Sequence, residues 1–387
     1  MFKTFLYGSL LPWFLTALLV SHAIPANVEA PVARMDADTV TAIDSAVAAA
    51  LKQNRLPGCV VLIGRTDEIL FEKAYGNRAV KPEVETMTVD TLFDLASLTK
   101  PIATATSVML LIERGDVELD APASKYLEEF TSHDKDNVTV RQLLLHTSGL
   151  TPDNHLRDYQ DGAEKAWERI CNLKLLSPPG ERFRYSDVGF IVLGRLVERV
   201  SGKPLNDFAI ANIFTPLGMS DTGYLPPKKL HVRAAPTQER NGHWMRGEVH
   251  DPRAYELRGV AGHAGLFSTA QDLARYAQMM LSMGRFGEAQ IMKPETFQTM
   301  TDAYKVSGGQ RGLGWDKRSG YSSNRGEGMS ERAFGHGGFT GTSIWIDPEL
   351  DLFVIFLSNR VHPDGKGSVN RLAGEIGGIA VKAIADR

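Results

Sequence analysis

The chain has 387 residues, of which 43% are hydrophobic and 23% are charged, and its formal net charge is −3. This is the composition of a globular protein, and the length allows a large core that needs neither disulfides nor a metal for stability. Acidic and basic residues are mixed along the chain without a basic stripe or a long run of like charge. We therefore expect no nucleic-acid partner.

The first residues have the pattern of an export signal. Lys3 is followed by an apolar stretch over residues 4–20, and small residues suitable for cleavage come after it. We predict a signal peptide over residues 1–23, and an exported protein that works in the periplasm or outside the cell. The alternative is a membrane anchor, although a stretch interrupted by Pro12 is short for a span. No other stretch is long enough to cross a bilayer, so we expect no stable span once the signal is removed.

The first element predicted after the leader is a helix over Thr39–Asn54, because its apolar residues recur with the spacing of one helical face. Apolar runs bounded by turn-forming residues predict strands near both ends of the chain, at Cys59–Arg65, Ile69–Tyr75, Gly341–Ile346 and Leu352–Ser358. Helical segments such as Ile102–Arg114 and Phe190–Val200 dominate the middle, and a last helix is expected over Arg371–Ala385.

Strands at both ends with helices between them predict an α/β (α+β) fold. One antiparallel sheet formed from both termini is flanked by helices and carries an inserted all-helical subdomain. We place the folded domain at 35–387, with the sheet subdomain at 35–100 and 256–387 and the helical subdomain at 101–255. Of the two cysteines, Cys59 lies in a predicted strand and is interpreted as a thiol of the core. A disulfide between Cys59 and Cys171 is left open as an alternative.

The first candidate site is Ser97-Leu98-Thr99-Lys100, directly before Pro101. Proline is tolerated only near the start of a helix, so the helix must begin within the few preceding residues. Ser97 and Lys100 then lie at i and i+3 on one face of the first turn. A serine hydroxyl is a weak nucleophile until a neighbour takes its proton, and Lys100 could orient it, or accept the proton if its pKa is depressed.

The second candidate is Tyr185-Ser186-Asp187, at the junction between a Pro/Gly-rich loop and a helix. A tyrosine near two cations can have a lowered phenol pKa and act as a base that later returns the proton to the leaving group. If Tyr185 and Lys100 share a proton, their titrations are coupled. The alternative is an aromatic side chain packed at the edge of a loop.

The third candidate is His336-Gly337-Gly338-Phe339. Glycines beside a strand let a substrate lie against the backbone, and an edge strand can then bind an extended acyl or peptide group. The N–H groups of Phe339 and Ser97 could form an oxyanion hole, in which each donor contributes about 3 kcal/mol. The alternative is a glycine-rich turn before an ordinary hairpin.

Ser97-x-x-Lys100, Tyr185-Ser186-Asp187 and His336-Gly337-Gly338, in this order, resemble the three signature motifs of class C β-lactamases, D-Ala-D-Ala peptidases and related esterases. The resemblance to this family of serine β-lactamases and penicillin-binding proteins covers nearly all of the mature chain. It implies an acyl-enzyme on Ser97, with Lys100 and Tyr185 as general base and acid and without a metal or other cofactor. It also implies an active site in a cleft between a helical domain and the sheet.

Two positions depart from the family pattern. The second motif commonly ends in Asn, whereas this chain has Asp187, which cannot donate a hydrogen bond and adds negative charge. The third motif of β-lactamases and peptidases usually begins with Lys, which supplies a permanent charge for a substrate carboxylate, whereas His336 is mostly neutral at pH 7. Both changes argue against β-lactam or D-Ala-D-Ala substrates.

The stretches that contain His250-Asp251 and His263 resemble a branch of the family that includes amidases cutting between N-acetylmuramic acid and L-alanine. We expect His250, Asp251 and His263 to line the cleft and bind a sugar or peptide. The same three residues could instead bind a metal, although their spacing fits no standard zinc pattern.

These observations predict a metal-independent serine hydrolase with a small-molecule or muropeptide substrate and no cofactor. Cell-wall muropeptide amides are the favoured substrates. The alternatives are a small-ester hydrolase, a D-Ala-D-Ala carboxypeptidase, a β-lactamase, or a non-catalytic penicillin-binding or sensing module. The oligomeric state is left open.

Overall fold

The structure is a computed structural model that describes residues 1–2 and 32–385. Most of the predicted signal segment, residues 1–23, therefore lies outside the described residues. Pro31–Arg387 form one compact unit. Within the part of the chain that is described, no helix is both long and apolar enough to span a bilayer.

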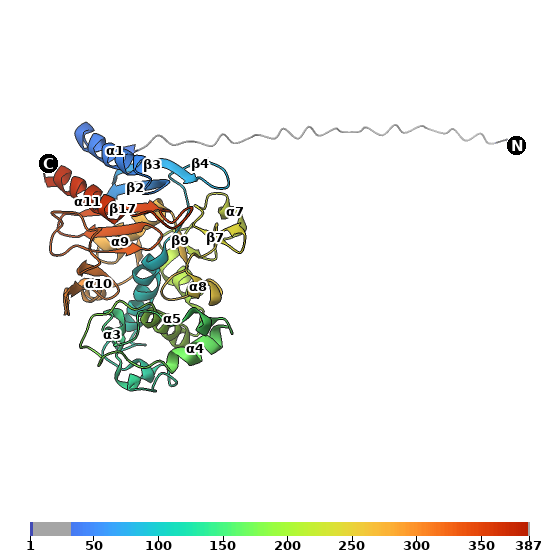
Figure 1. The fold of residues 1–387 in the computed structure, drawn as a ribbon, viewed down its shortest axis with the longest axis vertical. Helices are drawn as coiled ribbons and strands as arrows, with labels where there is room; N and C mark the ends of the chain where they lie inside the picture. The colour runs from blue at the N-terminus through green and yellow to red at the C-terminus, as the bar shows by residue number, and fades with distance from the viewer. Residues whose placement is uncertain (3–31, 386–387) are drawn as a thin grey trace. The chain divides into compact units, whose positions relative to one another are not determined.

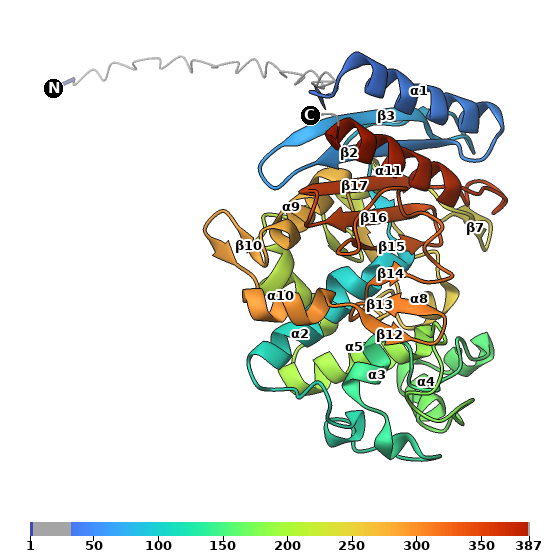
Figure 2. The same ribbon diagram turned by 90° about the vertical axis from the view of Figure 1, so that its left-hand side faces the viewer.

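The centre of this unit is a ten-stranded antiparallel sheet, whose strands follow one another down the molecule in Figure 2. Strands from the two ends of the chain meet in its middle, where β2 pairs with β17 over six residues. In spatial order the strands are β1 (Val32–Ala33), β3 (Ile69–Ala79), β2 (Gly58–Gly64), β17 (Leu352–Ser358), β16 (Thr342–Asp347), β15 (Phe334–Gly338), β14 (Asp316–Arg318), β13 (Gly309–Arg311) and β12 (Tyr304–Val306), with β4 (Glu85–Thr86) paired to β3.

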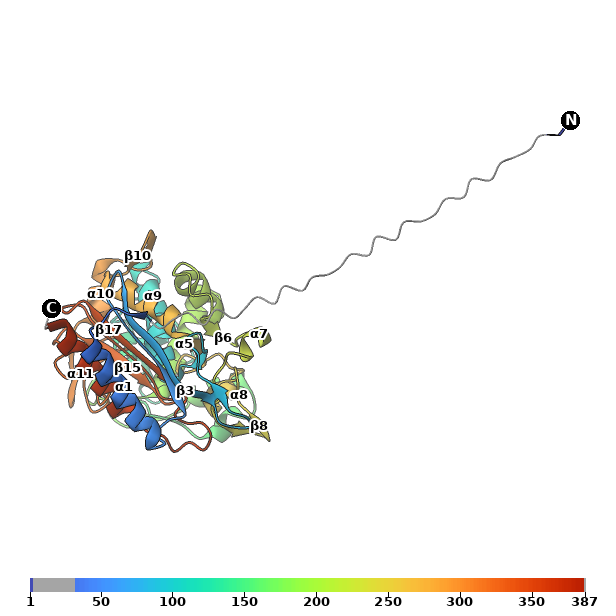
Figure 3. The same cartoon turned by 90° about the horizontal axis from the view of Figure 1, so that it is seen from above.

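The central strands β2 and β17 are almost entirely apolar, because both faces of the sheet are covered there. In β2, Cys59, Val61 and Ile63 pack on one side, and the alternating Val60 and Leu62 pack on the other. The first side is covered by α1 (Ala37–Lys52) and α11 (Asn370–Ala385), which lie side by side in Figures 1 and 3. The second side is covered by α9 (Ala270–Leu281) and the helical part of the chain.

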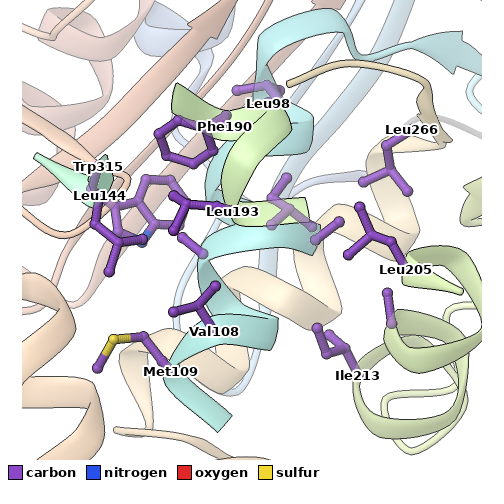
Figure 4. Packing of buried hydrophobic residues seen from close by; sticks show 14 of the residues in the cluster. Leu98, Val108, Met109, Leu144, Phe190, Leu193, Leu205, Ile213, Leu266 and Trp315 are labelled. Atoms are coloured by element: carbon purple, nitrogen blue, oxygen red, sulfur yellow. The ribbon is translucent and has the colours of Figure 1, made fainter. Parts of the chain in front are cut away.

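The segment between the two groups of strands is mainly helical. Its helices pack around α5, which contributes Phe190 and Leu193 to the core seen in Figure 4. The helices are α2 (Thr106–Glu113), α3 (Val140–Leu144), α4 (Ala163–Cys171), α5 (Asp187–Ser201), α6 (Leu205–Ala209), α7 (Lys228–His231) and α8 (Pro252–Glu256), and α10 (Pro294–Thr301) follows α9. The short strands β6 (Gly223–Tyr224), β7 (Glu239–Arg240) and β8 (His243–Trp244) also lie in this segment.

The predicted architecture is confirmed: helices flank an antiparallel sheet that both ends of the chain form together. The helix bounds shift by at most four residues, and β17 coincides with its predicted range. The largest shift is at the start of α2, Thr106 instead of Ile102, because a π-helical turn over Lys100–Ala105 precedes it. The sequence could not fix these bounds, because capping residues such as Asp36, which accepts a hydrogen bond from Thr39 N–H, decide where a helix starts. The subdomain boundaries remain a prediction. Cys59 and Cys171 are both buried and free, and they pack in different hydrophobic clusters.

Candidate active site

Ser97 lies in η1 (Ala96–Leu98), a short 3-10 helix that follows β5 (Phe93–Asp94). Lys100 begins η2 (Lys100–Ala105), a π-helical turn that leads into α2. Helical geometry therefore starts a few residues before Pro101, as the proline predicted. The Nζ atom of Lys100 donates a hydrogen bond of 3.0 Å to Oγ of Ser97. The i, i+3 spacing thus brings the amine of Lys100 within hydrogen-bond distance of the Ser97 hydroxyl, the candidate nucleophile.

A buried carboxylate holds the turn that carries Ser97. Ala96 has a left-handed φ of 46°, which is strained for a residue with a side chain. Asp94 stabilises this turn because its Oδ1 accepts the Ala96 N–H at 2.8 Å, while its Oδ2 accepts the His250 N–H at 2.6 Å. Burial raises the pKa of Asp94 to about 6. Asp94 therefore links the nucleophile turn to the His250 loop.

Lys100 is completely buried and is surrounded by acceptors. Its Nζ lies 2.6 Å from Oδ1 of Asp187, at the start of α5, and also donates to the backbone carbonyl of His263 at 3.0 Å. Burial opposes the charge, but the Asp187 carboxylate and the Tyr185 phenol outweigh it and raise the pKa of Lys100. The condition under which Lys100 alone would accept the serine proton, a depressed pKa, is therefore not met, because the acid that replaces the family's Asn is the counter-ion of this ammonium.

Tyr185 is placed by a stack of aromatic rings. Its ring lies between His146, with centroids 4.4 Å apart, and Tyr321, at 5.0 Å, and Nζ of Lys100 lies 5.0 Å from its centroid. The Nδ1 atom of His146 accepts the N–H of Ser186 at 3.0 Å, so this histidine fixes the turn that carries the phenol. His146 therefore ties the loop, and burial lowers its pKa well below the usual value.

The phenol does not have the lowered pKa that the sequence suggested. Burial raises the pKa of Tyr185, and the opposing effect of Lys100 does not cancel it, since Asp187 adds to the increase. The reason lies in the tertiary structure, because the second motif places the Asp187 carboxylate as well as the Tyr185 phenol beside Lys100. At neutral pH the resting site consequently holds a neutral phenol and an ammonium, and the two groups share their titration.

The glycine-rich motif forms the last residues of β15, which is an inner strand and not an edge strand. It pairs with β16 along its length but with β14 only at Gly335, so one side of His336–Gly338 is free of a described strand. The predicted open edge thus exists locally, because β14 is short. Gly338 is required here: a Cβ would lie 2.4 Å from the carbonyl oxygen of Leu95, just before Ser97.

His336 is buried and uncharged. Its Nδ1 contacts the carbonyl oxygen of Gly337 at 2.8 Å, and its ring centroid lies 5.9 Å from that of Tyr185. Burial, and then the positive charges of Arg311 and Lys100, lower the pKa of His336 well below its usual value. The first residue of the third motif therefore supplies no positive charge at neutral pH, as its identity indicated.

Ser97 lies where two cavities meet. Ser97, Tyr185, Tyr321 and Phe339 line both of them. The smaller cavity, of about 430 Å³, is also lined by Arg311, Asp316, Asn324, His336, Gly337, Gly338 and Arg360, together with residues 367–370. The larger, of about 720 Å³, is also lined by Asp153, Asp187, His250, Asp251, Arg253 and His263. A substrate bound across both would present its central bond to Ser97.

His250, Asp251 and His263, the residues expected from the amidase-like stretches, all line the larger cavity. His250 has a hydrogen-bond partner of its own, whereas Asp251 and His263 contact each other. Nε2 of His250 lies 2.7 Å from Oε1 of Gln238, and burial lowers the pKa of His250 to about 4. Asp251 caps α8 and accepts from Nε2 of His263 at 3.0 Å. Among the described residues, the group whose ligand atoms lie close enough to hold a metal consists of Asp187, Asp251 and His263, and it does not include His250. If a metal is bound in this cavity, its ligands are therefore expected to be these three residues and not the three named from the sequence.

Sequence reasoning missed Asp94, Arg311, Tyr321 and Arg360. Asp94 lies three residues before the nucleophile candidate, and an acid in an otherwise apolar run was a usable signal. The two arginines and Tyr321 stand in stretches with no motif, and only the folded chain brings them to the cavity wall.

Comparison with known proteins agrees with the fold and the motifs. The profile of the Beta-lactamase family matches residues 43–377. A Bacillus subtilis (strain 168) protein named N-acetylmuramyl-L-alanine amidase is 32% identical over 344 residues, which cover 79% of this chain and 78% of that protein. An Escherichia coli O157:H7 protein described as a candidate D-alanyl-D-alanine carboxypeptidase is 31% identical over 345 residues, which cover 79% of this chain and 79% of that protein.

Solved structures show the same fold. A penicillin-binding protein homologue from Caulobacter crescentus superposes with a TM-score of 0.73 at 21% identity, over 92% of this chain and 100% of that one. The matched profile spans the sheet strands from both ends of the chain and all three motifs. The chain therefore belongs to the beta-lactamase family and is a serine hydrolase.

Proposed function

We propose that this protein hydrolyses an amide through an acyl-enzyme on Ser97, and that cell-wall muropeptide-type amides are its substrates. The observation that carries the proposal is the convergence of three distant side chains: Nζ of Lys100 lies 3.0 Å from Oγ of Ser97 and 5.0 Å from the ring centroid of Tyr185, where two cavities meet. The name of the Bacillus subtilis relative supports the choice of amide.

In the first step Oγ of Ser97 attacks the carbonyl carbon of the amide, and its proton passes to the pair of Lys100 and Tyr185 in the form that has already lost one proton to solvent. This form is the minor one at neutral pH, because the pKa values of both groups are raised. The same pair then protonates the leaving nitrogen as the C–N bond breaks, so that an amine departs and the acyl group stays on Ser97. A water molecule, deprotonated by the pair, hydrolyses the ester. The products are a carboxylic acid and the amine, and Ser97 is regenerated.

The backbone beside Ser97 supports an oxyanion hole formed by the N–H groups of Ser97 and Phe339. Thr340 Oγ1 donates to the carbonyl of Asp94 at 2.7 Å, and Thr342 Oγ1 donates to that of Leu95 at 3.0 Å. These bonds hold the turn between β15 and β16, which contains Phe339, against the nucleophile turn. Donors fixed before the reaction stabilise the developing negative charge without reorganisation.

The alternatives differ in the substrate. A comparison of N-acetylmuramyl-L-alanine, a p-nitrophenyl ester, a D-Ala-D-Ala peptide and nitrocefin separates the amidase from the small-ester hydrolase, the carboxypeptidase and the β-lactamase. We expect N-acetylmuramyl-L-alanine to have the highest kcat/KM of the amide and lactam substrates. The reason is the similarity to the Bacillus subtilis protein named N-acetylmuramyl-L-alanine amidase, which is 32% identical to this chain. Higher kcat/KM for nitrocefin or the D-Ala-D-Ala peptide would contradict the proposal.

Asp187→Asn is expected to raise kcat/KM at pH 7 by about tenfold, because removing the carboxylate lowers the pKa values of Lys100 and Tyr185 and so increases the share of the pair that can accept a proton. In the wild type both pKa values are raised, so activity should increase toward alkaline pH. In the variant this increase should occur at lower pH. A pH profile of kcat/KM checks the prediction, and loss of activity at every pH would contradict it.

The same variant should be less stable at neutral pH. Asp187→Asn leaves the buried Lys100 ammonium without its carboxylate, which costs about 3 kcal/mol. The folded pKa of Lys100 is raised, so the pair stabilises fully below its unfolded value of about 10.4, and this stability is lost as the pH rises through the folded value. The difference between wild type and variant in urea unfolding should therefore shrink at strongly alkaline pH.

The proposal includes export, since the cell wall from which such amides derive lies outside the cytoplasm. The leader over residues 1–23 supports a periplasmic or extracellular location. Cell fractionation of the full chain, with N-terminal sequencing of the product, tests both the location and the removal of the leader.

A further inference from the structure

Phe339 supplies one of the two proposed oxyanion donors, and its contacts fix both its peptide and its side chain. The ring is 60% exposed, yet the ring of His250 stacks on it with centroids 5.5 Å apart and 25° between the planes. The guanidinium of Arg360 lies 4.5 Å from the same centroid, and its Nε donates to the carbonyl of Phe339 at 2.8 Å. The position of this donor therefore depends on the loop that carries His250 as well as on β15.

Asp94 connects the segments that carry the two donors. Its Oδ1 accepts the N–H of Ala96, directly before the nucleophile, at 2.8 Å, and its Oδ2 accepts the N–H of His250 at 2.6 Å. Its backbone carbonyl accepts from Oγ1 of Thr340, directly after Phe339, at 2.7 Å. One buried residue thus holds the neighbour of each donor and also the loop whose histidine packs on Phe339.

We infer that Asp94 is the positioning residue of the oxyanion hole and that its ionised carboxylate sets the geometry of both donors. Its two oxygens face one N–H group each, whereas a protonated acid or an amide would turn a donor toward one of them. A displacement of about 1 Å at a reacting group costs about 100-fold in rate, so the loss of either bond slows the attack. The inference rests on the proposed function and extends it to a residue that lines neither cavity.

The surroundings of Asp94 bring its titration into the mildly acidic range. Burial raises the pKa of Asp94 to about 6 and the Asp251 carboxylate adds to the increase, while the two N–H groups and the guanidinium of Arg240 oppose it. Burial lowers the pKa of the His250 ring to about 4, so that this ring is mostly uncharged when Asp94 titrates. As the pH falls through about 6, Asp94 should therefore take up a proton, release one N–H group and displace a donor.

The test measures how fast a fluorophosphonate labels Ser97 from about pH 5 to about pH 8, by intact-protein mass spectrometry. In the wild type, the logarithm of the rate should rise with pH with a slope of about one above pH 6, because the pair of Lys100 and Tyr185 loses a proton. Below pH 6 the slope should be about two, because Asp94 titrates as well. Asp94→Asn should be labelled about 10- to 100-fold more slowly at pH 7 and should keep a slope of about one throughout.

Asp272→Asn is the matched control. Asp272 is also a buried acid, on α9, and its Oδ2 accepts from the N–H of Asp221 and from Oγ1 of Thr222 at 2.8 Å each. It lines neither cavity, so the variant should be labelled within about threefold of the wild-type rate and with the wild-type dependence on pH. A lost buried carboxylate that acts only on stability would leave the slope unchanged in both variants.

Labelling does not depend on which amide is cleaved, so the two proposals can fail separately. If Asp94→Asn is slow as expected but the wild type does not cleave N-acetylmuramyl-L-alanine, the amidase proposal fails and the role of Asp94 stands. If Asp94→Asn has the wild-type rate and slope, the role of Asp94 is overturned and the amidase proposal stands.

The wild type decides the matter even if Asp94→Asn does not fold. A wild-type slope that stays at about one down to about pH 5, with the fold retained in circular dichroism, overturns the inference. Thr340→Val removes only the hydroxyl that donates to the carbonyl of Asp94, and it should slow labelling about threefold to tenfold without a change in slope.

Discussion

Ser97→Ala is expected to lower kcat/KM at least about ten-thousandfold and to abolish covalent labelling by a fluorophosphonate. The proposed acyl-enzyme cannot form without Oγ of Ser97. Alanine fits the 3-10 turn, and the ammonium of Lys100 keeps Asp187 and the His263 carbonyl as partners. We therefore expect the variant to fold.

Intact-protein mass spectrometry measures this directly, as one added phosphonyl group on the wild type and none on the variant. Ser107→Ala is the matched control, since Ser107 is a buried serine of α2 that lines neither cavity. It should be labelled like the wild type. Equal labelling of wild type and Ser97→Ala, or none of either, would contradict the assignment of Ser97 as nucleophile. Absence of labelling in both proteins would also favour a non-catalytic binding module with the same fold.

The fold was predictable because its signals are local. A strand covered on both faces must be apolar at every position, so Cys59–Ile63 and Leu352–Leu357 could be recognised without knowing their neighbours. The position of Pro101 similarly set the start of the helix that carries Lys100. The pairing of β2 with β17 followed only from the expectation that strands at both ends share one sheet. The π-helical turn over Lys100–Ala105 has no signal in the sequence.

The residues of the site were predictable but their protonation was not. Spacing and the three motifs identified Ser97, Lys100 and Tyr185, whereas the pKa of each group depends on burial and on charges from other elements. Asp187 was noted as a departure from Asn, yet its 2.6 Å contact with Lys100 depends on how α5 docks against η2. Arg360 was invisible because arginine is common on surfaces and no motif surrounds it.

Tyr185→Phe is expected to lower kcat about 100- to 10,000-fold with little change in stability. Phenylalanine keeps the ring contacts with His146 and Tyr321, so the variant loses the hydroxyl alone. That hydroxyl is one half of the pair that takes the proton from Ser97 and returns it to the leaving nitrogen. Lys100 remains as a proton carrier, but its raised pKa leaves little of it unprotonated at neutral pH.

Steady-state measurements of kcat across pH, together with thermal unfolding, separate this chemical role from a structural one. Tyr276→Phe is the control, because it also removes a buried hydroxyl, one that lies 2.8 Å from Thr106 Oγ1 in the core and lines neither cavity. We expect it to cost about 1 kcal/mol of stability while kcat stays within about threefold of the wild type. If Tyr185→Phe behaved in the same way, the phenol would be a packing residue, and Lys100 alone would have to move the proton, against the charge of Asp187 that holds it in place.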